Sequence, residues 1–119
     1  MYRKDDDTDG PQATPDLTPV PEPRCWLQTD HAGMIIDLSP GAAALIGLSR
    51  RGAIGRPFHQ FFGQDRDAVM HDMRMASGGG PPMSRERLLR GRGTKGAWLQ
   101  VRIQPAPEAG EVVWILWPR

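Results

Sequence analysis

The sequence predicts an α+β domain in which two strands are followed by short helices and then by three strands. Apolar residues recur at intervals of three and four between residues 58 and 76, which is typical of helices. Between residues 97 and 104 they alternate with polar residues, which is typical of a strand with one buried face. Glycine, proline and capping residues separate these segments. We therefore expect the helices in the middle of the chain, with strands before and after them.

Residues 1–23 differ in composition from the rest of the chain. They contain five prolines and six acidic side chains against two basic ones, with few large apolar residues. Such a segment buries too little apolar surface to offset the entropy that it loses on ordering. We expect a flexible acidic, proline-rich tail over residues 1–23 and one folded domain over residues 24–118. The tail has a formal charge of −4, whereas residues 24–119, with thirteen basic and eight acidic side chains, have +5.

The first two expected strands are Cys25–Thr29 and Met34–Leu38. Both are short apolar runs, and the sequence Asp30–Gly33 between them is typical of a turn. The two runs therefore predict a hairpin.

A short helix is expected over residues 40–46. Ser39 is a favoured N-cap because its hydroxyl accepts a hydrogen bond from a free amide, and Pro40 suits the first helical position. Gly47 is a favoured residue at the end of a helix. A second helical turn is expected over residues 49–53.

The next apolar residues predict two further helical stretches. Phe58, Phe61 and Phe62 have the spacing of one helical face. A helix is expected over Gln64–Ala76, and a helical wheel separates its residues into two sides. One side is apolar and faces the core (Val69, Met70, Met73 and Ala76), and the other is polar (Asp67, His71 and Arg74).

The last third of the chain predicts three strands after a break at Gly78–Pro82. They are expected over Ser84–Arg90, Ala97–Gln104 and Val112–Trp117. In the second of them, Leu99, Val101 and Ile103 share one face, while Trp98, Gln100, Arg102 and Gln104 share the other. The third is apolar on both faces, with Trp114 on one and Trp117 on the other.

Several short motifs occur in this order and resemble those of the PAS family. The matching residues are Asp30, Gly33 and Ile35, then Gly41, Ala42, Leu45, Gly47 and Ser49, then Ile54–Phe58, and finally Trp98. The resemblance covers roughly 95 residues, essentially everything after the tail. It implies a five-stranded antiparallel sheet with short helices packed on one face. It also implies either a stand-alone PAS protein or a fragment of a longer one.

The resemblance implies a domain of bacterial-type signal transduction without catalytic activity of its own. No catalytic triad, phosphate-binding loop or zinc-binding helix motif is present in the sequence. Three scattered histidines and one cysteine have no recognisable metal-ligand spacing. The single Cys25 suits a reducing cytoplasm, and no apolar run is long enough to span a membrane. We therefore expect a cytoplasmic domain with no metal site.

Two interpretations of the space between helices and sheet remain open. Nine apolar residues either pack as a core or line a pocket for a small metabolite: Phe58, Phe61, Phe62, Val69, Met70, Met73, Leu99, Val101 and Ile103. Haem-binding members of the family use a histidine on the long helix, and His71 is the residue in that place. Because the helical wheel turns His71 away from the core, we expect no haem, and no flavin cysteine motif is present. A packed core without cofactor is the favoured interpretation.

The outer face of the sheet is the expected partner site. It contains Trp98, Gln100 and Arg102, together with Trp114 or Trp117 from the last strand. Exposed aromatic residues of this kind mark interaction surfaces. The resemblance implies that the domain forms a homodimer or binds a partner signalling protein through this face.

A basic cluster begins in the expected third strand and continues into the segment after it; it consists of Arg85, Arg87, Arg90, Arg92 and Lys95. Arg85 and Arg87 share one face of a strand, so the cluster is either a positive surface for phosphates or acidic partners, or a charged strand that protects a sheet edge. The favoured interpretation is edge protection, and nucleic acid is not an expected partner. The acidic tail is a further candidate ligand for this cluster.

Overall fold

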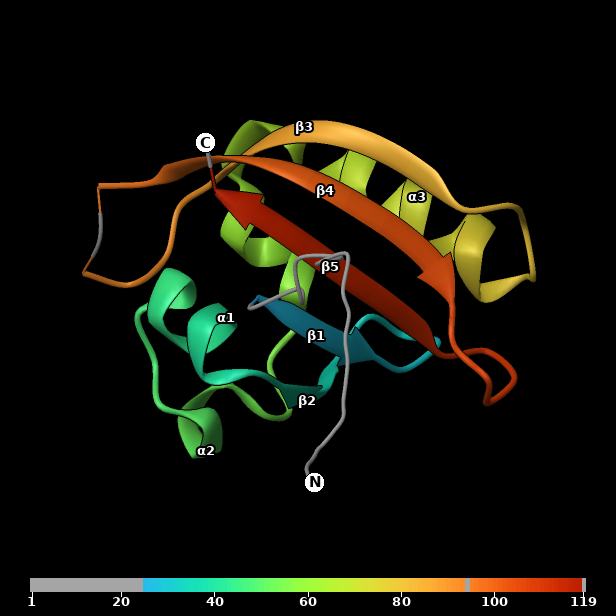
Figure 1. Ribbon diagram of the computed structural model, residues 1–119, viewed down its shortest axis with the longest axis horizontal. Helices are drawn as coiled ribbons and strands as arrows, with labels where there is room; N and C mark the ends of the chain where they lie inside the picture. Colours follow the sequence, from blue (N-terminus) through green and yellow to red (C-terminus); the bar gives the residue numbers. More distant parts are fainter. Residues whose placement is uncertain (1–24, 94, 119) are drawn as a thin grey trace, which may run out of the picture.

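The computed structural model describes residues 25–93 and 95–118 as a five-stranded antiparallel sheet with helices on one face (Figure 1). The expected tail, residues 1–23, lies outside the described residues. The elements in chain order are β1 (Trp26–Thr29), β2 (Ile35–Leu38), α1 (Pro40–Ile46), α2 (Arg50–Ala53), the 3₁₀ helix η1 (Phe58–Asp65), α3 (Arg66–Ser77), β3 (Met83–Leu89), β4 (Ala97–Pro105) and β5 (Val112–Pro118). Their spatial order in the sheet is β2-β1-β5-β4-β3. The predicted fold class is confirmed.

Local capping explains why α1 has the predicted bounds. The Ser39 hydroxyl accepts a hydrogen bond from the amide of Ala42 at 3.2 Å, which satisfies one of the free donors at the helix start. Pro40 occupies the first position. Gly47 ends the helix with a φ of 80°, a left-handed conformation that glycine adopts without a steric penalty.

The three phenylalanines and the long helix are separated by a kink at Gly63. Gly63 has a φ of 55° and a ψ of −120°, so it interrupts the helical geometry between Phe62 and α3. The long helix therefore begins at Arg66, two residues later than the sequence predicted, and ends at Ser77. Phe58, Phe61 and Phe62 are all buried, as their spacing predicted.

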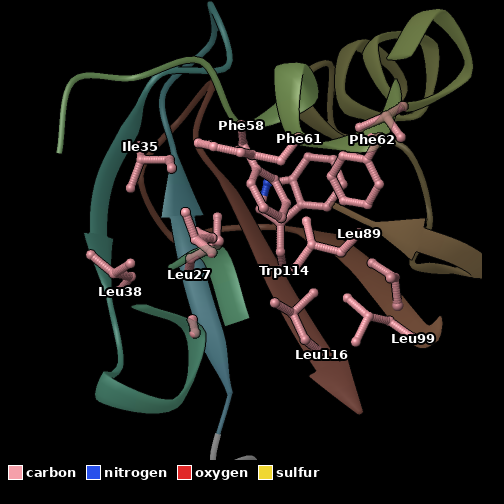
Figure 2. Packing of buried hydrophobic residues seen from close by; sticks show 14 of the residues in the cluster. Leu27, Ile35, Leu38, Phe58, Phe61, Phe62, Leu89, Leu99, Trp114 and Leu116 are labelled. Carbon is pink, nitrogen blue, oxygen red and sulfur yellow. The ribbon is translucent and has the colours of Figure 1, made fainter. Parts of the chain in front are cut away.

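The core lies between α3, η1 and the inner face of the sheet, and Trp114 is at its centre (Figure 2). The Phe58 ring contacts the Trp114 ring edge to face, with 5.0 Å between centroids, and contacts Phe62 at 4.9 Å. The buried Trp114 Nε1–H donates to Thr29 Oγ1 at 3.0 Å. The one polar atom of this large side chain is thus satisfied inside the core.

The loop between β3 and β4 is fixed to the end of α1. The amide of Arg92 donates to the carbonyl of Ile46 at 2.6 Å. A Cβ atom on Gly91 would overlap the carbonyl oxygens of Leu45 and Ile46, and one on Gly47 would overlap the carbonyl of Arg92. Glycine is therefore required on both sides of this contact.

The two edges of the sheet are protected in different ways. At β2, the segment 55–58 runs alongside the strand, and the amide of Ile35 donates to the carbonyl of Arg56 at 2.9 Å. The amide of Gly55 in turn donates a hydrogen bond to the carbonyl of Ile35 at 2.8 Å. At β3, the other edge strand, the central side chains are the charged residues 85–87.

Candidate functional site

The alternation predicted for β4 is present in the structure. Leu99, Val101 and Ile103 are buried on the inner face. On the outer face, Trp98 is 57% exposed, and Gln100 lies opposite Trp117 of β5. Trp117 is 38% exposed. The outer face therefore presents two large aromatic side chains.

The inclusion of Trp114 in the outer face was wrong. Trp114 is only 1% exposed and lies opposite Ile103 of β4 and Leu27 of β1, both of which are buried. Strand β5 is apolar on both faces, so its pattern did not distinguish the inward tryptophan from the outward one. The register does so, because it pairs Trp114 with inward-facing residues.

Two further residues extend the outer surface that the sequence predicted. Trp26 of β1 lies directly opposite Ile115 of β5, and Ile115 lies opposite Arg102 of β4. Both Trp26 and Ile115 are partly exposed. We call Trp26, Trp98, Ile115 and Trp117 the aromatic patch. The sequence analysis did not assign Trp26 to this face; the alternation of Trp26 with the buried Leu27 in β1 is the signal that could have found it.

The nine candidate pocket residues all lie in the layer between helices and sheet. Eight of them are buried, but Met70 is only partly so. Another residue of α3, Asp72, is buried in this layer and is only 3% exposed. The helical wheel correctly placed Val69, Met73 and Ala76 on the buried side of α3, but it made no prediction for Asp72.

Asp72 is buried because two arginines of β3 reach it. Arg87 donates to Asp72 Oδ2 at 3.1 Å, and Arg85 Nε lies 3.6 Å from the same oxygen. The Arg87 side chain is 19% exposed and its Nε has no partner among the described residues, whereas Arg85 is partly open to solvent. This ion-pair cluster connects α3 to the edge strand β3.

The structure divides the predicted basic cluster into two parts. Arg85 lies opposite Val101 and Arg87 opposite Leu99, so both arginines are on the inner face. They are engaged by Asp72 and do not form an outward positive surface. The remaining three, Arg90, Arg92 and Lys95, are exposed in the β3–β4 loop, and we call them the loop cations.

The histidines differ in their surroundings. His71 is exposed on α3, as the helical wheel predicted, so it does not point into the core. His59 is partly buried, and its buried Nδ1 has no hydrogen-bond partner within the described part of the chain. Burial lowers the pKa of His59, and the charges of Arg66 and Arg74 lower it further.

Cys25 is partly buried at the start of β1, and burial raises the pKa of its thiol. Within residues 25–93 and 95–118, no three His, Cys, Asp or Glu side chains come together as a metal site. No helix in this part of the chain has the length and apolar character needed to cross a membrane.

Comparison with known proteins identifies the family. A family model described as the PAS fold matches residues 22–117. No curated protein is significantly similar to the chain in sequence. Among solved structures, the PAS domain of a protein from Colwellia psychrerythraea is 20% identical, with a TM-score of 0.69, over 80% of this chain and 85% of the other.

Two further structures give the same result. The PAS domain of an HTR-like protein from Haloarcula marismortui has a TM-score of 0.69 and 18% identity, over 83% of this chain and 84% of that one. A domain of a sensory box sensor histidine kinase/response regulator from Geobacter sulfurreducens has a TM-score of 0.66 and 18% identity, over 77% of this chain and 80% of that one. With the family model matching most of its length, this chain belongs to the PAS fold family.

Proposed function

We propose that this PAS domain is a signalling module that acts by protein association, as a homodimer or with a partner protein, and has no catalytic activity of its own. PAS domains are generally sensory and non-catalytic modules. The observation that carries the proposal is the aromatic patch, in which Trp98 is 57% exposed beside Trp117 on the same face. Large exposed apolar surfaces of this kind are unfavourable in an isolated monomer and mark sites of association.

The contacts of the inner layer favour association over ligand sensing. The Phe58 ring already contacts both Phe62 and Trp114 in the layer between helices and sheet where a small molecule would lie (Figure 2). A ligand would have to displace these rings from close packing, at a cost in dispersion energy. Haem and small metabolites therefore remain the less favoured alternative, which an absorption spectrum and native mass spectrometry of the purified protein test directly.

The proposal is tested by the mass of the full chain in solution. The substitution Trp98→Glu places a charge in the aromatic patch, where association would bury it without a partner. We expect the wild-type chain to self-associate with increasing concentration in light scattering, and the variant to remain monomeric. Met75→Glu is the matched control, because Met75 is an apolar residue on α3 that is 50% exposed.

Circular dichroism should show that both variants are folded. Equal masses for the wild-type chain and Trp98→Glu at every concentration would contradict the aromatic patch as the interface. Loss of association in Met75→Glu as well would show that added charge, and not its position, is responsible.

A further inference from the structure

The chain enters the domain directly beside the aromatic patch. Cys25 precedes β1, and the amide of Leu116 donates to its carbonyl at 2.8 Å. Trp26, the next residue, belongs to the patch and lies opposite Ile115. The start of β1 therefore lies at the end of the sheet where β5 finishes and β4 begins (Figure 1).

The same end of the sheet carries an uncompensated positive charge. Residues 87–107 contain five basic side chains and no acidic one. Arg87 is paired with Asp72, but the loop cations and Arg102 take part in none of the ion pairs found among the described residues. The Arg102 Nε donates only to Gln104, at 2.9 Å, on the outer face. Four cations without an ion pair among the described residues therefore lie in β4 or in the loop directly before it.

The chemistry of residues 1–24 is complementary to this surface. Residues 1–23 have a formal charge of −4, and four aspartates are concentrated at positions 5, 6, 7 and 9. Leu17 and Val20 are the large apolar residues nearest to the domain, and prolines surround them. Proline lacks an amide donor, so this part can lie on a surface without adding a strand to the sheet.

The length of the segment is sufficient for both contacts. Trp26 of β1 and Arg102 of β4 both lie opposite Ile115 of β5, so the two are at the same height in the sheet. Trp98 is four residues from Arg102 along β4, so the patch extends about 13 Å along the strands. An extended chain advances roughly 3.3 Å per residue. The segment is therefore long enough for Leu17 and Val20 to span the distance to Trp98 and Trp117, and for the aspartates, which are more distant in the chain, to span that to the loop cations.

We propose that residues 1–24 bind back over the aromatic patch of the same chain, with Leu17 and Val20 on the tryptophans and the aspartates on the loop cations. The segment would then compete with a second copy or a partner protein for the same patch. This competition rests on the proposed function. Association is then controlled by whatever removes the acidic segment, such as salt or a more basic competitor.

The test uses the indole Nε1–H signals of the full-length chain in NMR spectra. Trp98 and Trp117 report on the patch, and Trp114 is an internal control because its Nε1–H is bonded to Thr29 on the inner face. Replacing the four aspartates together (Asp5→Asn, Asp6→Asn, Asp7→Asn and Asp9→Asn) should shift the Trp98 and Trp117 signals and leave Trp114 in place. Raising the salt concentration of the wild-type chain should shift them in the same direction, because exposed ion pairs are screened.

Two controls separate this contact from other causes. Glu108→Gln removes an exposed carboxylate from the turn at the opposite end of β4 and should leave both signals unchanged. The shifts should also be independent of protein concentration, since the contact is within one chain. Shifts that depend on concentration but not on the aspartates would instead mean that a second copy covers the patch, and the inference would be wrong.

The failure of this inference and that of the proposed function give different results. If the Trp98 and Trp117 indole signals do not shift on replacement of the aspartates or on addition of salt, the inference is wrong, whatever the mass of the protein. A chain that stays monomeric at all concentrations overturns the proposed self-association, while the indole signals still decide whether the segment is bound. If both proposals hold, the Asp→Asn variant should dimerise about fivefold more tightly, the effect of several exposed ion pairs together.

Discussion

The inner and outer faces of the β4–β5 pair both carry tryptophan, but in opposite environments. Trp114 is enclosed by Phe58 and Thr29, with its polar atom satisfied. Trp98 and Trp117 are on the other face and are partly open to solvent. The same residue type therefore contributes to stability on one side of the sheet and is available for binding on the other, and the register alone decides which.

The largest expected effect tests this difference directly. Trp114→Ala should lower the free energy of unfolding by roughly 3–5 kcal/mol, because it leaves a cavity in a close-packed core. Trp98→Ala should change it by no more than about 0.5 kcal/mol, as expected for an exposed position. Urea unfolding followed by circular dichroism measures both values.

Should Trp114→Ala fail to fold, Trp114→Phe gives a smaller loss in the same direction. Equal losses at positions 98 and 114 would mean that the two faces do not differ in the way described.

A smaller effect is expected from the ion-pair cluster at the edge of the inner face. Asp72→Ala leaves Arg87 largely buried without its carboxylate and should cost about 1–3 kcal/mol, less than a fully buried pair because Arg85 is solvated. Asp67→Ala is the matched control, since Asp67 is an exposed carboxylate on the same helix. Thermal unfolding of the two variants measures the difference. If both lose the same amount, the buried pair contributes nothing specific.

The smallest effect concerns the partly buried histidine of the inner layer. The pKa of His59 is lowered in the folded protein from an ordinary value of 6.5, so the unfolded chain binds its proton more tightly. The stability due to neutral His59 is therefore complete above pH 6.5 and is lost as the pH falls toward the lowered pKa. His59→Gln should flatten the pH dependence of the unfolding midpoint in this range.

The control for this experiment is His71→Gln, which changes an exposed histidine on α3. It should keep the pH dependence of the wild-type chain. A His59→Gln profile that parallels the wild type would show that the histidine does not titrate differently in the folded state.

Local signals in the sequence predicted the fold well. The bounds of α1 were correct because Ser39, Pro40 and Gly47 act on their nearest neighbours. The alternation in β4 correctly separated Trp98 from Leu99, because a strand has a period of two residues.

The errors concern residues whose environment depends on a distant part of the chain. Trp114 was not distinguished from Trp117, because only pairing with β1 and β4 determines which of them is inward. Asp72 was not predicted to be buried, because its burial depends on arginines that arrive from β3. A helical wheel contains no information about charges supplied by another element.

The protection of both sheet edges affects how copies of this chain can assemble. A strand from another molecule would have to displace residues 55–58 from β2, or lie against the charged side chains of β3. Growth into a filament by strand addition is therefore disfavoured at each end of the sheet. If, as proposed, two copies associate through equivalent outer faces, such an isologous contact is closed at two chains and does not polymerise.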